Sequence, residues 1–309
     1  MQNNKSMGLC LWIIGLFAYL LLLSGCRNST NASTFPKLLQ DSIHRMILRC
    51  PGSVGVAIIV NNHDTITVNN NNNYPMMSVF KLHQALATCN HLDKQGVSID
   101  SVLDIQQKEL DPNTWSPMMK EHKEALIRLS IRDLLCYALI QSDNNSSNIL
   151  FDRILSVENT DLYIASLLPR KAFKIAYTES EIAKDHGKAY ANFSTPLATA
   201  ILINRLFTER ILSEDYQSFI KETLTRCMTG EKRIASPLLG KKGVSIVHKT
   251  GSGYRDKGIL AAHNDAAYIT LPNGTNYTLI IFTKDFRGSE AEASRVISQI
   301  SAIVYKYLT

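Results

Sequence analysis

Strand-like segments lie near both ends of this chain and helical patterns fill the stretch between them, an order that limits the folds open to it. Five short runs are rich in β-branched and apolar residues, as strands are; they are 54–60, 65–68, 244–248, 259–269 and 277–283. From residue 74 to about residue 228 the patterns are mainly helical. The sequence therefore predicts an α+β fold of the α/β sandwich type. An antiparallel sheet domain is built from both termini, with helices on its faces, and an all-α domain is inserted into it.

The expected boundaries give the sheet domain residues 36–73 and 230–309, and the helical domain residues 74–229. Within the helical part, Ser130-Ile131-Arg132-Asp133 has the pattern of a capping box, and Thr195-Pro196 has that of an N-cap followed by proline. The last helix is expected to bury one apolar face, consisting of Val296, Ile300, Ile303 and Tyr307. Because ligand sites are common where domains meet, we expect the active site in the cleft between the two domains.

The composition is that of an ordinary globular protein. Of the 309 residues, 45% are hydrophobic and 19% are charged, which suits a sizeable core. The net charge of +6 is spread along the chain, and no RNP, zinc-finger or basic-helix motif accompanies it, so we expect no nucleic-acid partner. The cysteines and histidines form no C-x-x-C or H-E-x-x-H motif. We therefore expect neither a metal nor another cofactor.

The first 26 residues differ in kind from the rest. A single lysine is their only charge, and the apolar run at 7–23 is short for a membrane span. The run ends in Leu23-Ser24-Gly25-Cys26, which resembles the lipobox of bacterial lipoproteins. This resemblance implies a signal peptide over residues 1–25, a lipidated Cys26 and a polar tether over residues 26–35. A single-span anchor is the alternative. Either interpretation sends the folded part across a membrane, and we expect a periplasmic, membrane-tethered protein.

Four cysteines remain once Cys10 is assigned to the signal peptide and Cys26 to lipid; they are Cys50, Cys89, Cys136 and Cys227. Four cysteines permit three pairings, and the sequence does not choose among them. Cys89 and Cys136 both lie in apolar helical patterns, where the sequence does not favour a disulfide bridge over a buried free thiol.

Three short motifs carry the chemistry of the sequence. Ser78 and Lys81 form an S-x-x-K motif at the start of a helical pattern, Ser142-Asp143-Asn144 follows the end of another, and Lys249-Thr250-Gly251 closes a strand. Alone, Ser78 could be an N-cap and Lys81 a surface residue whose ammonium reaches water. Together, in this order and context, the motifs resemble the serine β-lactamases of class A and their penicillin-binding relatives, whose signature is S-x-x-K, S-D-N and K-T-G.

The resemblance extends from about residue 36 to the C-terminus. Trp115-Ser116-Pro117 resembles the aromatic-Ser-Pro segment at the cleft rim of class A enzymes. The stretch AAHND at 261–265 resembles the cephalosporinase-leaning branch found in Bacteroidetes and in some extended-spectrum enzymes. These features imply a monomeric β-lactam hydrolase that acts through a serine acyl-enzyme on cephalosporins and penicillins and confers resistance to them.

The spacing of Ser78 and Lys81 suits nucleophilic catalysis. A serine hydroxyl is a weak nucleophile until a neighbouring base takes its proton, and residues three apart on a helix share one face. The helix N-terminus and a second cation, Lys249, disfavour the charge on Lys81 and would leave an amine able to accept that proton. Ser78 would then attack the lactam carbonyl, whose oxygen the backbone N–H groups of Ser78 and Ser252 would stabilise.

The remaining motif residues complete the expected site. Ser142 would pass a proton to the lactam nitrogen as the ring opens, and Lys249 would hold the Ser142 hydroxyl in a positive field. Five residues are expected to bind the substrate: Trp115, Asn144, Thr250, Gly251 and Ser252. Asn144 would offer its amide to the acylamino side chain, and Thr250 and Ser252 would bind the carboxylate. The aspartate of the S-D-N motif is expected to tie its loop to backbone N–H groups.

Release of the acyl-enzyme requires a base that activates water. In class A this base is a glutamate on a loop about 36 residues after the S-D-N serine. Glu179 lies at about that distance here, and Glu181 is the fallback. We assign deacylation to Glu179. For acylation, Lys81 is the first candidate, and Glu179 acting through a water molecule is the second.

The loop around Glu179 departs from the class A pattern. Ala183 stands where the family has the asparagine that helps to hold the water, and Ser180 stands where it has proline. The Arg–Asp ion pair that usually closes the loop would fall at Tyr177 and Asn192, which cannot form one. We therefore expect the loop to close by different contacts, with a wider pocket beneath it that suits bulky oxyimino-cephalosporins.

Two rival functions remain. A penicillin-binding D,D-peptidase shares the serine, the lysine and K-T-G but turns lactams over poorly, and a non-catalytic lipoprotein would use the cleft to bind peptidoglycan fragments. Glu179 and the compact chain favour the hydrolase over the peptidase. The intact set of Ser78, Lys81, Ser142 and Lys249 favours an enzyme over a binding module, because binding needs no nucleophile.

Overall fold

The computed structural model describes residues 34–309 of the chain. The predicted signal peptide, Cys26 with its lipid and most of the predicted tether lie outside the described residues. Within residues 34–309, no helix combines the length and the apolar character needed to cross a bilayer.

The chain divides into two compact units, one ending at Leu39 and the other formed by Gln40–Thr309. Helix α2 (Thr34–Ile47) runs across their boundary. Residues 34 and 35, predicted to belong to the tether, are instead the first residues of this helix. The sequence analysis missed α2.

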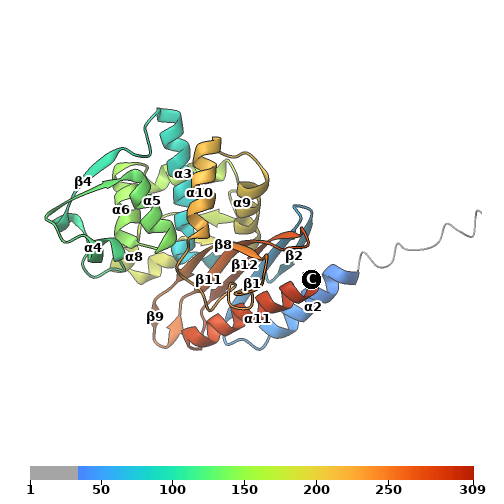
Figure 1. Cartoon of the computed structure of the whole chain (residues 1–309). Helices are drawn as coiled ribbons and strands as arrows, with labels where there is room; N and C mark the ends of the chain where they lie inside the picture. The colour runs from blue at the N-terminus through green and yellow to red at the C-terminus, as the bar shows by residue number, and fades with distance from the viewer. Residues whose placement is uncertain (1–33) are drawn as a thin grey trace, which may run out of the picture. The chain divides into compact units, whose positions relative to one another are not determined.

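A five-stranded antiparallel sheet is the framework of the Gln40–Thr309 unit (Figure 1). Its strands, in spatial order, are β2 (Asp64–Val68), β1 (Ser53–Val60), β12 (Asn276–Lys284), β11 (His263–Thr270) and β8 (Ser245–Ser252). Two of these strands precede the helical middle of the chain and three follow it. Strand β1 is buried over almost its whole length, because it is an inner strand with apolar side chains on both faces. The predicted α+β class, with an antiparallel sheet built from both ends, is confirmed.

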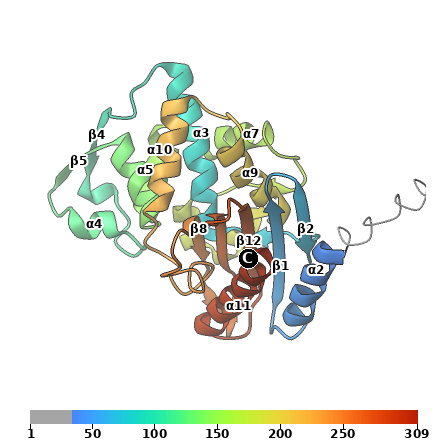
Figure 2. The same ribbon diagram turned by 45° about the vertical axis from the view of Figure 1, so that its right-hand side comes forward.

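Helices cover both faces of this sheet. Helix α9 (Pro196–Thr208) packs on one face against β1 and β12, and α11 (Glu290–Leu308) packs on the opposite face against β11 and β12 (Figures 1 and 2). The remaining helices are α3 (Phe80–Gln95), α4 (Pro117–Glu121), α5 (Ile131–Ile140), α6 (Asn144–Arg153), α7 (Val157–Ala165), α8 (Glu179–Lys184) and α10 (Glu214–Thr225). The short 3₁₀ helices are η1 (Met77–Val79), η2 (Gln107–Glu109) and η3 (His186–Ala191).

Two predicted helix starts are confirmed. The Ser130 hydroxyl accepts from the Asp133 N–H while the Asp133 carboxylate accepts from the Ser130 N–H, which makes a capping box for α5. The Thr195 hydroxyl caps α9, and Pro196 occupies the first helical position.

The buried face of α11 differs from the prediction. It consists of Ala293, Ile297, Ile300 and Val304, together with Ser301. The four apolar positions follow the i, i+4, i+7, i+11 spacing of one helical stripe. Of the predicted face, only Ile300 belongs to this stripe, whereas Val296, Ile303 and Tyr307 lie beside it and are half-buried.

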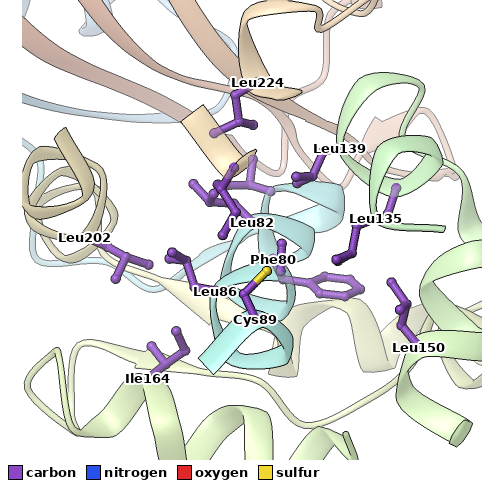
Figure 3. Close-up of a cluster of buried hydrophobic side chains, with 14 of the residues drawn as sticks. Phe80, Leu82, Leu86, Cys89, Leu135, Leu139, Leu150, Ile164, Leu202 and Leu224 are labelled. Atoms are coloured by element: carbon purple, nitrogen blue, oxygen red, sulfur yellow. The ribbon is translucent and has the colours of Figure 1, made fainter. Parts of the chain in front are cut away.

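The helical part of the chain is packed around α3, whose first ten residues are all buried. Figure 3 shows the apolar cluster around its first turns, to which neighbouring helices contribute leucines. Phe80 stacks on Phe151 of α6 with 6.0 Å between the ring centroids. Because η1 leads directly into α3, this packing fixes the segment that carries Ser78 and Lys81.

Small sheets also occur between residues 74 and 229. Strand β4 (Val102–Gln106) pairs with β5 (Leu126–Ser130), and β7 (Phe193–Ser194) lies between β3 (Tyr74–Pro75) and β6 (Phe173–Lys174). This stretch is therefore mainly helical, whereas we expected it to be entirely so. The β4 segment lacks a strand signal because only its Ile105 is buried.

The run 259–269, predicted as one strand, is broken near its start. Strand β10 (Ile259–Leu260) pairs with β9 (Arg255–Asp256), and β11 begins only at His263. The two alanines between them bond instead to the chain just after β8: the Ala261 N–H donates to the Tyr254 carbonyl, and the Ala262 carbonyl accepts from the Gly253 N–H.

The Gln40–Thr309 unit is compact as a whole. The division of the chain into a sheet domain and a helical domain, with the boundaries given above, therefore stays a prediction. The four cysteines of the described residues, Cys50, Cys89, Cys136 and Cys227, are all free thiols.

Candidate active site

Ser78 and Lys81 meet at the start of α3. Ser78 lies in η1, one turn before Lys81, and the Lys81 Nζ is 2.9 Å from the Ser78 Oγ. The preceding residue, Met77, has a φ of 48°, and the turn it makes brings the backbone of η1 onto β8. Gly251 of β8 allows this approach, because a Cβ there would lie 2.5 Å from the Met76 carbonyl oxygen. The glycine of the K-T-G motif thus serves the packing of the Ser78 segment.

Lys81 is completely buried and surrounded by oxygen atoms. Besides Ser78, its Nζ contacts the Ser142 carbonyl oxygen at 3.0 Å, the Asn144 Oδ1 at 2.5 Å and the Glu179 Oε1 at 2.7 Å. Buried charges in proteins are tolerated where they are paired and hydrogen-bonded, and both conditions hold here. Lys81 therefore joins the S-x-x-K, the S-D-N and the Glu179 segments.

Ser142 and Lys249 form a second contact. Ser142 has a φ of 60°, and its Oγ accepts from the Lys249 Nζ at 2.9 Å. Burial of Lys249 lowers the pKa of its ammonium to about 7; the charge on Cys227 opposes this shift and the charge on Lys81 adds to it. The predicted role of Asp143 is confirmed, because its carboxylate accepts from the N–H groups of Met118 and Ser146.

Glu179 reaches the same place from α8. Its Oε1 accepts from the Ser78 Oγ at 3.2 Å, and its side chain is almost fully buried. Glu181, the fallback candidate, faces elsewhere: its carboxylate accepts from the N–H and the hydroxyl of Thr178 and completes a capping box for α8. Of the two loop glutamates, the structure brings Glu179 alone to Ser78.

The loop that carries Glu179 closes through amide side chains. The Asn192 Oδ1 accepts from the N–H groups of Ala176 and Tyr177, and its Nδ2 donates to the Tyr177 carbonyl. Ser180 is held to Asn148 by two hydrogen bonds, from Asn148 Nδ2 to its hydroxyl and from its own N–H to Asn148 Oδ1. These contacts replace the ion pair that Tyr177 and Asn192 cannot form, and the expectation of a different closure is confirmed.

A cavity of about 860 Å³ opens over Ser78. Among its lining residues are predicted site residues from all three motifs and the rim: Ser78, Trp115, Ser142, Asn144, Glu179, Thr250 and Ser252. Trp115 is 55% exposed, and its indole N–H donates to the Gln141 carbonyl. The Asn144 Nδ2 donates to Thr114 Oγ1 at 2.8 Å, and the Thr250 Oγ1 lies 2.6 Å from Thr229 Oγ1. Lys81 and Lys249 lie beneath this lining.

Arg233 is a site residue that the sequence analysis missed. It is buried, lines the cavity and donates to Ser252 Oγ at 2.6 Å and to the carbonyls of Gly251 and Asn264. Burial lowers the pKa of its guanidinium, but an arginine keeps its charge at neutral pH. In the sequence it is the third residue of Glu231-Lys232-Arg233, which looks like an exposed charged turn, and no motif sets it apart.

Comparisons with known proteins identify the family of this chain. The model of the beta-lactamase enzyme family matches residues 38–308. A beta-lactamase of Phocaeicola vulgatus is 51% identical over 100% of this chain and 98% of its own. The solved structure of TLA-3 extended-spectrum beta-lactamase has a TM-score of 0.84 at 33% identity, covering 88% of this chain and 99% of its own. A class A beta-lactamase from Bacteroides cellulosilyticus has a TM-score of 0.83 at 31% identity, with coverages of 88% and 98%. The chain therefore belongs to the beta-lactamase enzyme family and is a class A enzyme that hydrolyses β-lactams.

Proposed function

We propose that Ser78 is the acylating nucleophile of this β-lactamase. The observation that carries the proposal is the contact of its Oγ with two candidate bases, Lys81 Nζ at 2.9 Å and Glu179 Oε1 at 3.2 Å. A serine needs such a neighbour to lose its proton as it attacks. Ser78 also lines the cavity, which gives a lactam carbonyl access to its oxygen. The N–H groups of Ser78 and Ser252 form the proposed oxyanion hole.

Glu179 is the proton acceptor that we propose for acylation, ahead of Lys81. A lysine ammonium has three N–H donors, and four oxygen atoms lie within 3.0 Å of the Lys81 Nζ. All three N–H donors of the ammonium are therefore engaged by these oxygens. An ammonium has no lone pair, so Lys81 orients Ser78 while Glu179 accepts the proton. This order reverses the one expected from the sequence.

Ser142 is the proposed donor to the lactam nitrogen. The Lys249 Nζ donates to the Ser142 Oγ, which leaves the hydroxyl proton free to point into the cavity. As the C–N bond breaks, the nitrogen gains a lone pair and takes this proton. Lys249 stabilises the negative charge that develops on the serine oxygen.

Glu179 is also the proposed base for deacylation. Once Ser78 carries the acyl group, the Glu179 carboxylate can accept a proton from a water molecule, which then attacks the ester. Ala183 lines the same cavity where the family has an asparagine, so backbone groups and Glu179 itself must hold this water. A base in this position separates a lactamase from a D,D-peptidase.

Substrate binding is proposed to use separate groups of residues for the carboxylate, the acylamino group and the rest of the substrate. Thr250, Ser252 and Arg233 offer two hydroxyls and a guanidinium to the substrate carboxylate. Asn144 keeps its proposed contact with the acylamino group, but it must share its amide with Lys81 and Thr114. Trp115 would pack against the substrate at the rim.

We propose that cephalosporins, including those with bulky oxyimino groups, are the preferred substrates and that penicillins are also hydrolysed. The size of the cavity and a loop closed by amides instead of an ion pair support this preference. The name of TLA-3, an extended-spectrum beta-lactamase, supports it by likeness. We further propose a periplasmic protein tethered through a lipid on Cys26, because the N-terminal pattern is that of a lipoprotein. The resemblance to class A enzymes is the support for a monomer.

Steady-state kinetics on a small panel tests the substrate proposal. The panel contains a penicillin, a simple cephalosporin, an oxyimino-cephalosporin and a D-Ala-D-Ala peptide. We expect kcat/KM to be higher for both cephalosporins than for the penicillin, and the peptide not to be turned over. A clear preference for the penicillin contradicts the substrate proposal, and turnover of the peptide faster than any lactam would favour the D,D-peptidase.

A further inference from the structure

Next to the K-T-G motif, Cys227, His248 and Asp265 form a group of polar side chains that lactam hydrolysis does not use. Asp265 on β11 is fully buried; its Oδ1 lies 3.0 Å from the His248 Nδ1, and its Oδ2 accepts from the Ile234 N–H. The His248 ring adjoins the Cys227 thiol. A thiol, an imidazole and a carboxylate in this order are the parts of an activated cysteine nucleophile.

The charges around Cys227 favour its thiolate. Burial raises the pKa of the thiol, but the hydrogen bond to His248 and the charges of His248 and Lys249 bring it down to about 7. Burial likewise lowers the pKa of His248, and the charge and hydrogen bond of Asp265 outweigh burial and raise it to about 10. At neutral pH an imidazolium therefore lies beside a thiol that ionises readily, the surroundings that make cysteines reactive.

The other cysteines of the described residues have different surroundings. Burial raises the pKa of Cys50 and of Cys89, and Cys89 has no exposed surface. Cys136 is half-buried, as Cys227 is, but the nearest group that bonds its sulfur is the Arg226 guanidinium at 3.6 Å. Cys136 is therefore the matched control for Cys227.

Cys227 is linked to the active site through Thr229. The Cys227 Sγ lies 3.4 Å from the Thr229 Oγ1, which lies 2.6 Å from the Thr250 Oγ1 in the cavity. The packing here is tight: a Cβ added at Gly230 would lie 2.4 Å from the Thr250 Cγ2. Thr229 therefore links the Cys227 sulfur to Thr250, and a group attached to this sulfur would compete with Thr229 for space.

We propose that Cys227 is a modification site for small-molecule disulfides and that its adduct lowers lactamase activity by displacing Thr250 from the substrate carboxylate. The Cys227 thiol releases its proton to water, the imidazolium of His248 stabilises the resulting thiolate, and the thiolate attacks one sulfur of the disulfide. The S–S bond of the reagent breaks, a new S–S bond forms at Cys227, and the other half leaves as a thiolate with the electron pair. The Cys227 sulfur is oxidised and the leaving sulfur is reduced, so no other oxidant takes part. A reducing thiol reverses the step.

Labelling with 2,2′-dithiodipyridine tests the reactivity without any lactam. The folded enzyme is labelled between about pH 5 and pH 9, release of thiopyridone is followed by absorbance, and peptide mass spectrometry assigns the site. At pH 6 we expect Cys227 to react about five-fold or more faster than Cys136, because the larger thiolate fraction outweighs the lower nucleophilicity of an acidic thiol. The Cys227 rate should rise with a midpoint near pH 7. Faster labelling of Cys136 or Cys50, or a midpoint of about 8.5 as in a free thiol, overturns the proposal.

Two variants and an activity assay complete the test. His248→Gln should slow labelling of Cys227 and raise its midpoint while the thiol remains; thermal unfolding checks that this variant is folded. Wild-type enzyme labelled at Cys227 should lose most of its kcat/KM for a cephalosporin and regain it with dithiothreitol, whereas Cys227→Ser should resist this inactivation and Cys136→Ser should not. Unchanged kcat/KM after complete labelling of Cys227 overturns the effect on the active site. Because the labelling rates are measured without a lactam, they test the reactivity of Cys227 independently of the roles proposed for Ser78 and Glu179.

Discussion

The carboxylate of Glu179 lies 2.7 Å from the Nζ of Lys81, and both side chains are almost completely buried. Removing two charges from water is costly, and a buried pair is tolerated only where hydrogen bonds satisfy the remaining groups. Ser78, Ser142 and Asn144 supply oxygens to Lys81, and Ser78 also donates to Glu179. The contacts that stabilise the pair therefore also hold both groups against the nucleophile.

Glu179→Gln should convert the enzyme into one that acylates but barely turns over. The amide keeps the shape of the side chain but cannot accept a proton from water, so the steady-state rate should fall by about 10²–10⁴-fold. Lys81 keeps its contact with the Ser78 Oγ and is then the remaining candidate base for acylation, so acylation should continue at a reduced rate. We expect a burst followed by very slow turnover, with the acyl-enzyme persisting in the mass spectrum.

The matched control is Glu181→Gln, two residues further along the same helix. Its carboxylate caps Thr178 and does not reach Ser78, so turnover should stay near normal while stability falls by about 1 kcal/mol or less. Accumulation of acyl-enzyme in Glu181→Gln instead would move the base by two residues. A burst rate unchanged in Glu179→Gln would make Lys81 the base for acylation.

The sequence predicts the site well where each group lies within a short motif. Ser78 and Lys81 are one turn apart, so local helical geometry alone brings them together, and Thr250 and Ser252 share one strand. The sequence also predicts the strands of the five-stranded sheet, since a strand buried on both faces, such as β1, is apolar throughout.

The features that the sequence does not predict depend on contacts between distant segments. Hydrogen bonds to the carbonyls of Gly251 and Asn264 hold Arg233 in the site. The residues near Arg233 in the chain do not indicate these contacts. The buried stripe of α11 was mistaken because neighbouring apolar residues allow more than one stripe, and only packing against the sheet selects Ala293, Ile297, Ile300 and Val304. The exposed strand β4 carries too few buried residues to give a periodic signal.

Ser78→Ala should abolish lactam hydrolysis and leave the fold intact. The methyl group fits the space of the serine side chain but offers no oxygen to the lactam carbonyl. Circular dichroism and thermal unfolding check the fold, and mass spectrometry of the wild type with a slow substrate should locate the adduct on Ser78. Substantial hydrolysis by Ser78→Ala would remove Ser78 as the nucleophile.

Cys26→Ala tests the proposed tether. If a lipid on Cys26 holds the protein at a membrane, this variant should move from the membrane fraction to the soluble fraction of the cell envelope. The mature wild-type protein should begin at Cys26 and carry the mass of the lipid. A mature protein that still begins at Met1 favours the single-span anchor, and Cys136→Ser serves as a control for the loss of a thiol.

The activity should fall on the alkaline side as Lys249 loses its charge. Burial lowers the pKa of Lys249 to about 7, so the ammonium that faces Ser142 and attracts the substrate carboxylate is lost as the pH rises through this value. We expect kcat/KM, which reports the free enzyme, to decline above about pH 7. Lys249→Arg should be less active at pH 7 but show no such decline, because a guanidinium stays charged. An equal decline in both proteins would assign the titration to another group.

Stability should decrease in mild acid because two histidines are buried in their neutral form. Burial lowers the pKa of His83 to about 4 and, with the charge of Arg233, that of His263 to about 3, against 6.5 for an ordinary histidine. A lowered pKa in the folded state means that the unfolded chain binds more protons below pH 6.5. The free energy of unfolding that these two neutral histidines contribute is therefore fully present above pH 6.5. It is lost as the pH falls toward 4. Each group contributes a slope of up to about 1.4 kcal/mol per pH unit. Urea unfolding between about pH 6.5 and pH 5, which lies above the pKa of most carboxylates, should show this loss. In His83→Leu, the slope of the unfolding free energy against pH should be smaller by the contribution of one titrating group. A slope unchanged in His83→Leu would mean that His83 is not buried as the neutral form.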